Sequence, residues 1–125
     1  MAKSYADIIR MVDEMRPNAV PQDEKCRILH EIEMRVHLLI GPAEGFDADD
    51  VPAEVGAESM TDVLMRVQPP FDALYLWYLA AQVDAYAVQT AAYENDIILF
   101  NRAWDDYAKF YVRSGRARRC VYGAG

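Results

Sequence analysis

The stretch from Phe71 to Arg113, FDALYLWYLAAQVDAYAVQTAAYENDIILFNRAWDDYAKFYVR, decides the fold of this chain. It contains neither glycine nor proline, and its apolar and aromatic side chains recur at helical spacing. One helix of this length is long for a chain of 125 residues, so we expect two helices, over 71–87 and 91–113. The break is expected near Ala87–Thr90, where the β-branched Val88 and Thr90 weaken helix formation.

Two further helices are predicted upstream, over 4–15 and 21–40. Ser4 followed by Asp7 is typical of a helix cap, and Pro21 suits the first turn of the second helix. Gly41 and Pro42 are expected to end that helix. The sequence therefore predicts a mainly all-α protein, a small helical bundle, with a core of Ile8, Ile9, Val12, Leu29, Ile32, Val36, Leu74, Tyr78, Leu79, Ile97, Phe100 and Trp104.

Residues 41–68 form a long acidic loop, which we expect to be flexible. Between positions 44 and 62 the chain has acidic residues and no basic one. Loops of this length without regular structure are uncommon in small domains. The alternation of apolar residues over 63–67 favours a short strand, whereas 58–66 fits a helical turn or two equally well. The predicted organisation is a single helical domain, 1–113, followed by a basic tail, 114–125.

Charge is segregated along the chain. The net charge is -7, and all 20 acidic residues lie within 1–112, whereas residues 113–125 contain only basic charges. An acidic surface repels nucleic acid, so a sequence-reading DNA-binding module is not expected. Segregated charge is typical of surfaces that meet oppositely charged partners, although solvated flexible segments have the same pattern. The charged interface candidates are Arg113, Arg116, Arg118, Arg119, Asp47, Asp49 and Asp50.

No catalytic or cofactor motif accompanies this pattern, and we expect no enzyme activity, cofactor or metal. His30, Glu33 and His37 share a helix face, but a metal site needs three or four converging ligands, and the Glu-x-x-His pattern of di-iron bundles is missing. Glycine-rich phosphate loops and nucleophile motifs are absent as well. Cys26 and Cys120 do not suggest a disulfide framework, and no apolar run reaches the length of a membrane span or a signal peptide. The sequence thus predicts an intracellular, soluble domain.

Aromatic residues are unusually dense in the decisive stretch and fall on more than one helical face. A small domain cannot bury all of them, and tyrosine and tryptophan are favoured at protein–protein contacts. We therefore expect some of them to form an interface, with the candidates Tyr75, Trp77, Tyr86, Tyr93, Tyr107 and Tyr111.

The decisive stretch and the proline before it contain the motifs Pro70-Phe71-Asp72-Ala73-Leu74-Tyr75, Gln82-Val83-Asp84, Tyr93-Glu94-Asn95 and Leu99-Phe100-Asn101. These motifs resemble those of the head–tail connector (adaptor) proteins of phages and prophages of Gram-positive bacteria. The resemblance covers 69–113 and, more loosely, the first two predicted helices with the Arg16-Pro17 between them. The family often has Asn-Gly at the last turn, where this chain has Ala87-Val88.

The resemblance implies a structural virion protein, made in the host cytoplasm, that oligomerises into a neck ring beneath the portal. The expected partners are the portal protein, other neck and tail-completion proteins and further copies of the chain. Genome DNA would pass through the channel without sequence-specific binding, and no membrane would be involved. The alternative is an acidic helical inhibitor or DNA mimic that binds a basic host protein as a monomer or dimer.

Overall fold

The computed structural model describes residues 2–45 and 51–113 and contains four helices. Over these residues there is no named β-strand, so the prediction of an all-α bundle is confirmed. None of the described helices is long and apolar enough to cross a membrane. The helices are α1 (Tyr5–Met15), α2 (Gln22–Glu44), α3 (Ala73–Tyr86) and α4 (Thr90–Arg113).

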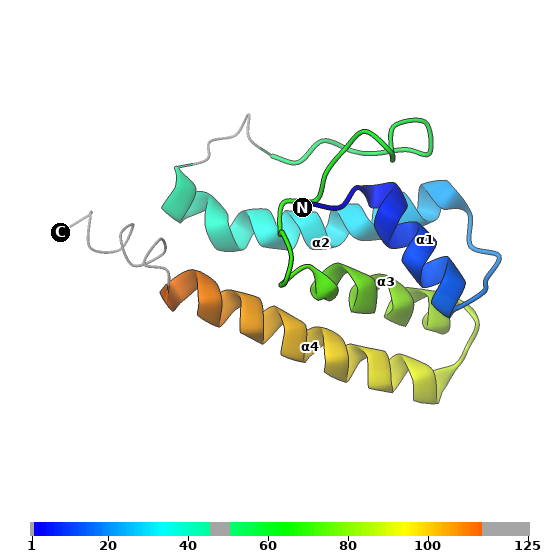
Figure 1. Ribbon diagram of the computed structural model, residues 1–125. Helices are drawn as coiled ribbons and strands as arrows, with labels where there is room; N and C mark the ends of the chain where they lie inside the picture. The colour runs from blue at the N-terminus through cyan, green and yellow to red at the C-terminus, as the bar shows by residue number, and fades with distance from the viewer. Residues whose placement is uncertain (1, 46–50, 114–125) are drawn as a thin grey trace.

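The third helix is the centre of the molecule. It packs against each of the other three, and α1 also packs against α2 (Figure 1). By contrast, α4 packs mainly on α3, with which it forms an antiparallel hairpin along one side of the bundle. This difference in position explains why α3 is nearly apolar all round, whereas α4 is amphipathic.

The start of α1 confirms the predicted cap. The Ser4 side chain accepts a hydrogen bond from the backbone N–H of Asp7, and the Asp7 carboxylate accepts one from the backbone N–H of Ser4. These reciprocal bonds satisfy two amide groups that would otherwise lack partners at the helix N-terminus.

The predicted end of α2 is wrong. Instead of stopping at Gly41 and Pro42, the helix continues to Glu44 and ends at Gly45, which has a left-handed backbone with φ of 74°. Proline removes one helical hydrogen bond, the one to the carbonyl of Leu38. The Leu38 side chain is 73% exposed, so that side of the helix faces water, which can solvate the freed carbonyl.

The described part of the acidic loop, 51–68, is hydrogen-bonded to α1 and α2. Met60 accepts a backbone hydrogen bond from Ala6 at 2.9 Å, and the amide of Ala57 donates to the Asp23 carboxylate at 2.7 Å. The expected short strand is reduced to one antiparallel bridge between Ser4 and Leu64, and residues 57–62 form turns. A strand needs a neighbour along several residues, and here the chain pairs only with the short segment before α1.

The core agrees with the prediction at ten of its twelve positions. Ile97 and Trp104 are half-buried rather than buried, although Trp104 packs against the core. Both residues lie on α4, and because α4 packs mainly on α3, only one narrow stripe of it is fully covered. Four buried tyrosines were not among the predicted core residues: Tyr5, Tyr75, Tyr107 and Tyr111.

Candidate functional site

Three of the aromatic interface candidates are buried inside the single chain. Tyr75 is fully buried, and Tyr107 and Tyr111 are nearly so. The Tyr75 hydroxyl donates to the Glu33 carboxylate and accepts from the backbone N–H of Val67 at 2.9 Å. These side chains therefore stabilise the subunit, and the expectation that they form an exposed interface does not fit their positions.

The other aromatic candidates remain accessible to different degrees. Tyr86 is 60% exposed at the end of α3, while Trp77 and Tyr93 are half-buried. Among the charged candidates, Arg113 is exposed at the end of α4. The remaining candidates lie outside the described residues: Arg116, Arg118, Arg119, Asp47, Asp49 and Asp50.

The two histidines and Glu33 do not converge on a common point. His30 Nε2 lies 3.0 Å from the carbonyl oxygen of Pro52, and His37 Nδ1 lies 2.9 Å from a guanidinium nitrogen of Arg66. Glu33 is buried and accepts hydrogen bonds from Tyr75 and from the backbone N–H of Arg66. Within the described ranges, no group of three or more histidine, cysteine or acidic residues could hold a metal ion.

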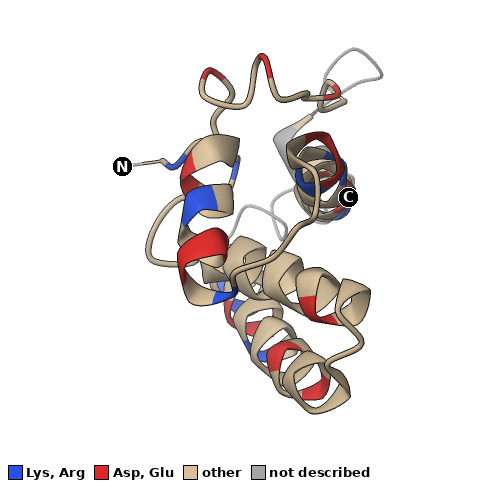
Figure 2. Cartoon of the chain, turned by 90° about the vertical axis from the view of Figure 1, so that its right-hand side faces the viewer, with Lys and Arg blue, Asp and Glu red and all other residues tan. Residues whose placement is uncertain are grey.

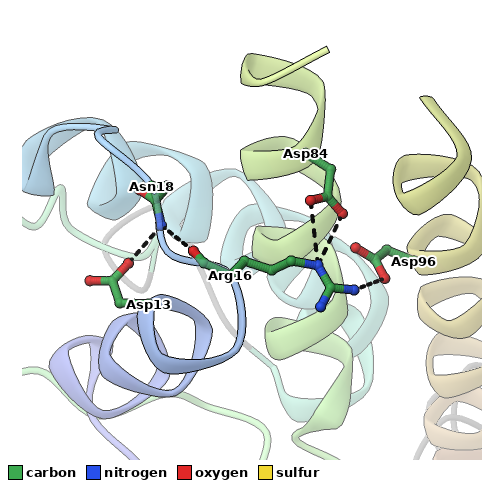
Figure 3. A network of polar contacts seen from close by, with 5 residues as sticks. All are labelled: Asp13, Arg16, Asn18, Asp84 and Asp96. Carbon is green, nitrogen blue, oxygen red and sulfur yellow. Dashed lines mark hydrogen bonds and ion pairs between the residues drawn. The ribbon is translucent and has the colours of Figure 1, made fainter. Parts of the chain in front are cut away.

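A buried ionic network that the sequence did not predict lies at the C-terminal end of α3. It joins α3 to α4 and to the residue that follows α1. Arg16, directly after α1, extends between α3 and α4 (Figure 3). Its Nε lies 3.4 Å from the Asp84 carboxylate on α3, and one terminal nitrogen lies 3.1 Å from Asp96 Oδ1 on α4. We call Arg16, Asp84 and Asp96 the Arg16 network.

The backbone around Arg16 is fixed by side chains of α1 and the following connection. The Asn18 amide donates to the Arg16 carbonyl at 2.7 Å and to the Asp13 carboxylate at 3.0 Å, as Figure 3 shows. Asp13 also forms an ion pair at 2.6 Å with the buried Lys25 of α2. Asn18 thus fixes the backbone of Arg16, while Asp84 and Asp96 bind its guanidinium.

The network contains two carboxylates for one guanidinium. Asp96 is fully buried, Asp84 is 3% exposed, and Oδ2 of Asp96 has no hydrogen-bond partner among the described residues. Burial raises the pKa of Asp96 to about 6, the neighbouring Asp84 adds to this rise, and Arg16 opposes it. Asp96 can therefore gain or lose a proton near neutral pH.

A groove lies beside the Arg16 network, between the α1–α2 connection and the end of α3. It has a volume of about 500 Å³. Arg16 and Asp84 lie on its polar side, while Met15, Val20 and Val83 contribute apolar surface. It has the size of a ligand pocket, but it is only partly enclosed, so it suits a protein side chain better than an enclosed small molecule.

The turn between α3 and α4, which lies beside this groove, has an unusual backbone. Val88 has φ of 55°, a left-handed conformation that β-branched residues rarely adopt, and its side chain is 81% exposed. The turn is closed by hydrogen bonds from the amides of Ala87, Val88 and Gln89 to carbonyls at the end of α3. The predicted break between the last two helices is confirmed, but it forms around valine instead of glycine.

A second groove lies at the opposite end of the α3–α4 hairpin. Residues 68–71 form one wall and the last turns of α4 form the other, with a volume of about 410 Å³. Phe71 and Phe110 stack there with their ring centroids 4.4 Å apart, and Phe110 is 45% exposed. We call this site the aromatic groove; its other lining residues are Arg66, Val67, Gln68, Pro69, Pro70, Tyr107 and Tyr111.

The sequence contained one partial signal for the residues of the Arg16 network. Arg16 and Asp84 both belong to motifs that resemble the connector family, and Asp96 directly follows a third. Their convergence could not be predicted, because 68 positions separate Arg16 from Asp84. No family model, curated protein or solved structure matches this chain.

Proposed function

We propose that this chain is a structural subunit of a phage neck, a head–tail connector that oligomerises beneath the portal and links it to tail-proximal proteins. One observation carries the proposal. Residues from two motifs of the family resemblance, Arg16 and Asp84, meet in one buried network, together with the residue that follows a third. Residues of structural motifs are expected to meet in this way in the folded chain, because they hold helices together.

The surface of the chain also supports an assembly role. Large apolar side chains are exposed at both ends of the α3–α4 hairpin, including Tyr86, Val88 and Phe110. Exposed apolar residues that gather at a rim or groove mark protein contacts more often than residues scattered singly. The acidic character of the chain fits a channel wall along which DNA slides without binding.

The proposal is tested with phage heads that contain the portal but lack this chain. Added purified chain is expected to restore joining of heads to tails, counted as joined particles by electron microscopy. A chain that binds no portal-containing head but binds a basic host protein as a monomer would contradict the proposal and favour the inhibitor.

The basic tail provides a matched variant for this experiment. Replacing Arg113, Arg116, Arg118 and Arg119 with serine is expected to leave the melting temperature nearly unchanged and to slow joining, most visibly at low salt. Exposed ion pairs contribute about 0–1 kcal/mol each, so charge sets orientation and rate more than affinity. Normal joining at every ionic strength would show that the tail has no part in docking.

A further inference from the structure

The two ends of the α3–α4 hairpin differ in shape. At the turn, Tyr86 and Val88 project from the surface, 60% and 81% exposed. We call these two residues the turn-end surface. At the far end, the aromatic groove is a hollow whose walls come from residues 68–71 and from α4. One end therefore presents an apolar projection and the other an apolar hollow.

The conformation of Val88 indicates that its side chain has a role outside the fold. A left-handed backbone costs an ordinary residue about 1–2 kcal/mol, and glycine or asparagine would avoid most of that cost. The exposed side chain buries little apolar surface in return. Strain that packing does not explain is a reason to look for function at the same position.

The charges at the two ends are complementary. In the first two turns of α4, residues 90–97, Glu94 is exposed and no basic residue occurs, while Asp96 is buried against Arg16. The last turn, residues 109–113, contains Lys109 and Arg113 and no acidic residue, and Arg66 lines the groove beside it. Figure 2 views the molecule from the side of the turn and shows acidic residues on the nearest parts of the hairpin. The exposed Glu94 of one copy would therefore meet the basic last turn of α4, Lys109 and Arg113, of another.

We propose that the turn-end surface of one copy of this chain packs into the aromatic groove of the next copy. Because the two surfaces lie at opposite ends of the same hairpin, the contact is heterologous, and a pair of copies keeps one free turn end and one free groove. Such a contact builds a closed ring or an open chain of subunits. The inference rests on the proposed function, because this contact would join the subunits of the proposed neck assembly.

The test uses the purified full chain and two variants that keep the fold. Val88→Asn removes the apolar projection and suits a left-handed backbone, and Phe110→Gln removes the exposed ring from the groove while retaining a good helix former. Ile98→Gln is the matched control, because Ile98 is 58% exposed on α4 but belongs to neither surface. Association is measured by sedimentation velocity over a range of protein concentrations and at two salt concentrations.

Wild-type chain is expected to associate in a concentration-dependent manner, less strongly at high salt. Val88→Asn and Phe110→Gln should each weaken association at least about tenfold, whereas Ile98→Gln should match the wild type. A mixture of the two variants retains one intact contact per pair, because the groove of the first accepts the turn of the second. The mixture should therefore form one-to-one dimers that do not grow.

Three results would overturn the inference: a wild-type chain that stays monomeric at all concentrations, variants that associate normally, or a mixture that grows like the wild type. The joining assay separates this inference from the proposed function. If the variants join heads to tails normally, the contact is wrong while the connector role stands. If joining is lost but self-association is normal, the surfaces bind a different protein and the proposed contact between copies is likewise wrong.

Discussion

Buried carboxylates occur near both ends of α3, and their surroundings differ. At the beginning of the helix, Glu33 accepts hydrogen bonds from the Tyr75 hydroxyl and from the backbone N–H of Arg66, one at each of its oxygens. At the end of the helix, Asp96 has one oxygen bound to Arg16 and the other without a partner among the described residues. Both residues are almost completely buried.

The comparison shows that burial alone does not decide what an acidic residue does. Burial raises the pKa of both carboxyls, and at Glu33 hydrogen bonds from Tyr75 and Arg66 offset part of that rise. Glu33 is thus matched to donors that require a carboxylate, whereas Asp96 competes with Asp84 for one guanidinium. Changes that remove charge should therefore have opposite effects on stability at the two sites.

The largest effect is expected from Arg16→Ala, which leaves Asp84 and Asp96 buried without a cation. Loss of one partner from a buried ion pair costs about 3–5 kcal/mol, and we expect about 2–4 kcal/mol here because the Arg16 side chain is 30% exposed. The loss should be smaller at pH 5 than at pH 8, since protonation then relieves the uncompensated charge.

Urea unfolding at the two pH values measures this difference. Arg10→Ala is the matched control, because Arg10 is exposed and pairs only loosely with Asp7, at 3.5 Å. An equal loss for both variants would show that the Arg16 network contributes no more than a surface pair.

A smaller loss, about 1–3 kcal/mol, is expected from Glu33→Gln. The amide group of glutamine has one oxygen and one nitrogen, so it can accept from Tyr75 or from the Arg66 backbone but presents a donor to the other. Urea unfolding at pH 7 checks the result, with the exposed Glu94→Gln as control. If the two variants are equally stable, the pairing at Glu33 contributes little to the fold.

Asp96→Asn is expected to stabilise the chain by about 1–2 kcal/mol at pH 8 and to have little effect near pH 4. The pKa of Asp96 is about 6 in the folded chain and close to its usual value, 3.8, when unfolded. Between these values the folded chain binds more protons, so the contribution of this group to stability decreases as the pH rises. Asparagine is neutral throughout and removes that decrease.

The difference in unfolding free energy between Asp96→Asn and the wild type, plotted against pH, isolates this group from the others. It should increase from about pH 4 to about pH 6 and then level off, following the two pKa values that linkage connects. A flat difference, or one that decreases with pH, would mean that burial does not disfavour the charged form of Asp96.

The smallest effect is expected at the turn that follows the Arg16 network. Val88→Gly should raise the free energy of unfolding by about 0.5–1 kcal/mol, because relief of the left-handed strain exceeds the entropy cost of glycine. The melting temperature measures this gain, and Val63→Gly, at an exposed residue of ordinary backbone, is the control. Destabilisation by Val88→Gly would show that the valine side chain packs within the subunit.

The sequence predicted the helices well where local chemistry determines them. Ser4 and Asp7 cap α1 as expected, and the break between α3 and α4 lies where β-branched residues interrupt the pattern. The prediction was wrong at Gly41 and Pro42, because a proline in the last turns of a helix removes only one hydrogen bond, here the one to the carbonyl of the exposed Leu38. The end of α2 therefore depends on solvent exposure, which local sequence does not give.

By itself, the sequence determined the number of helices, their approximate bounds, most of the core and the segregation of charge, since all of these follow from spacing along the chain. Only the tertiary structure decided which acidic residues are buried, which aromatic residues are left on the surface and where the two grooves lie. The physical reason is that pairs such as Arg16–Asp84 and Tyr75–Glu33 join residues that are 68 and 42 positions apart. Their contact depends on how whole helices pack against α3.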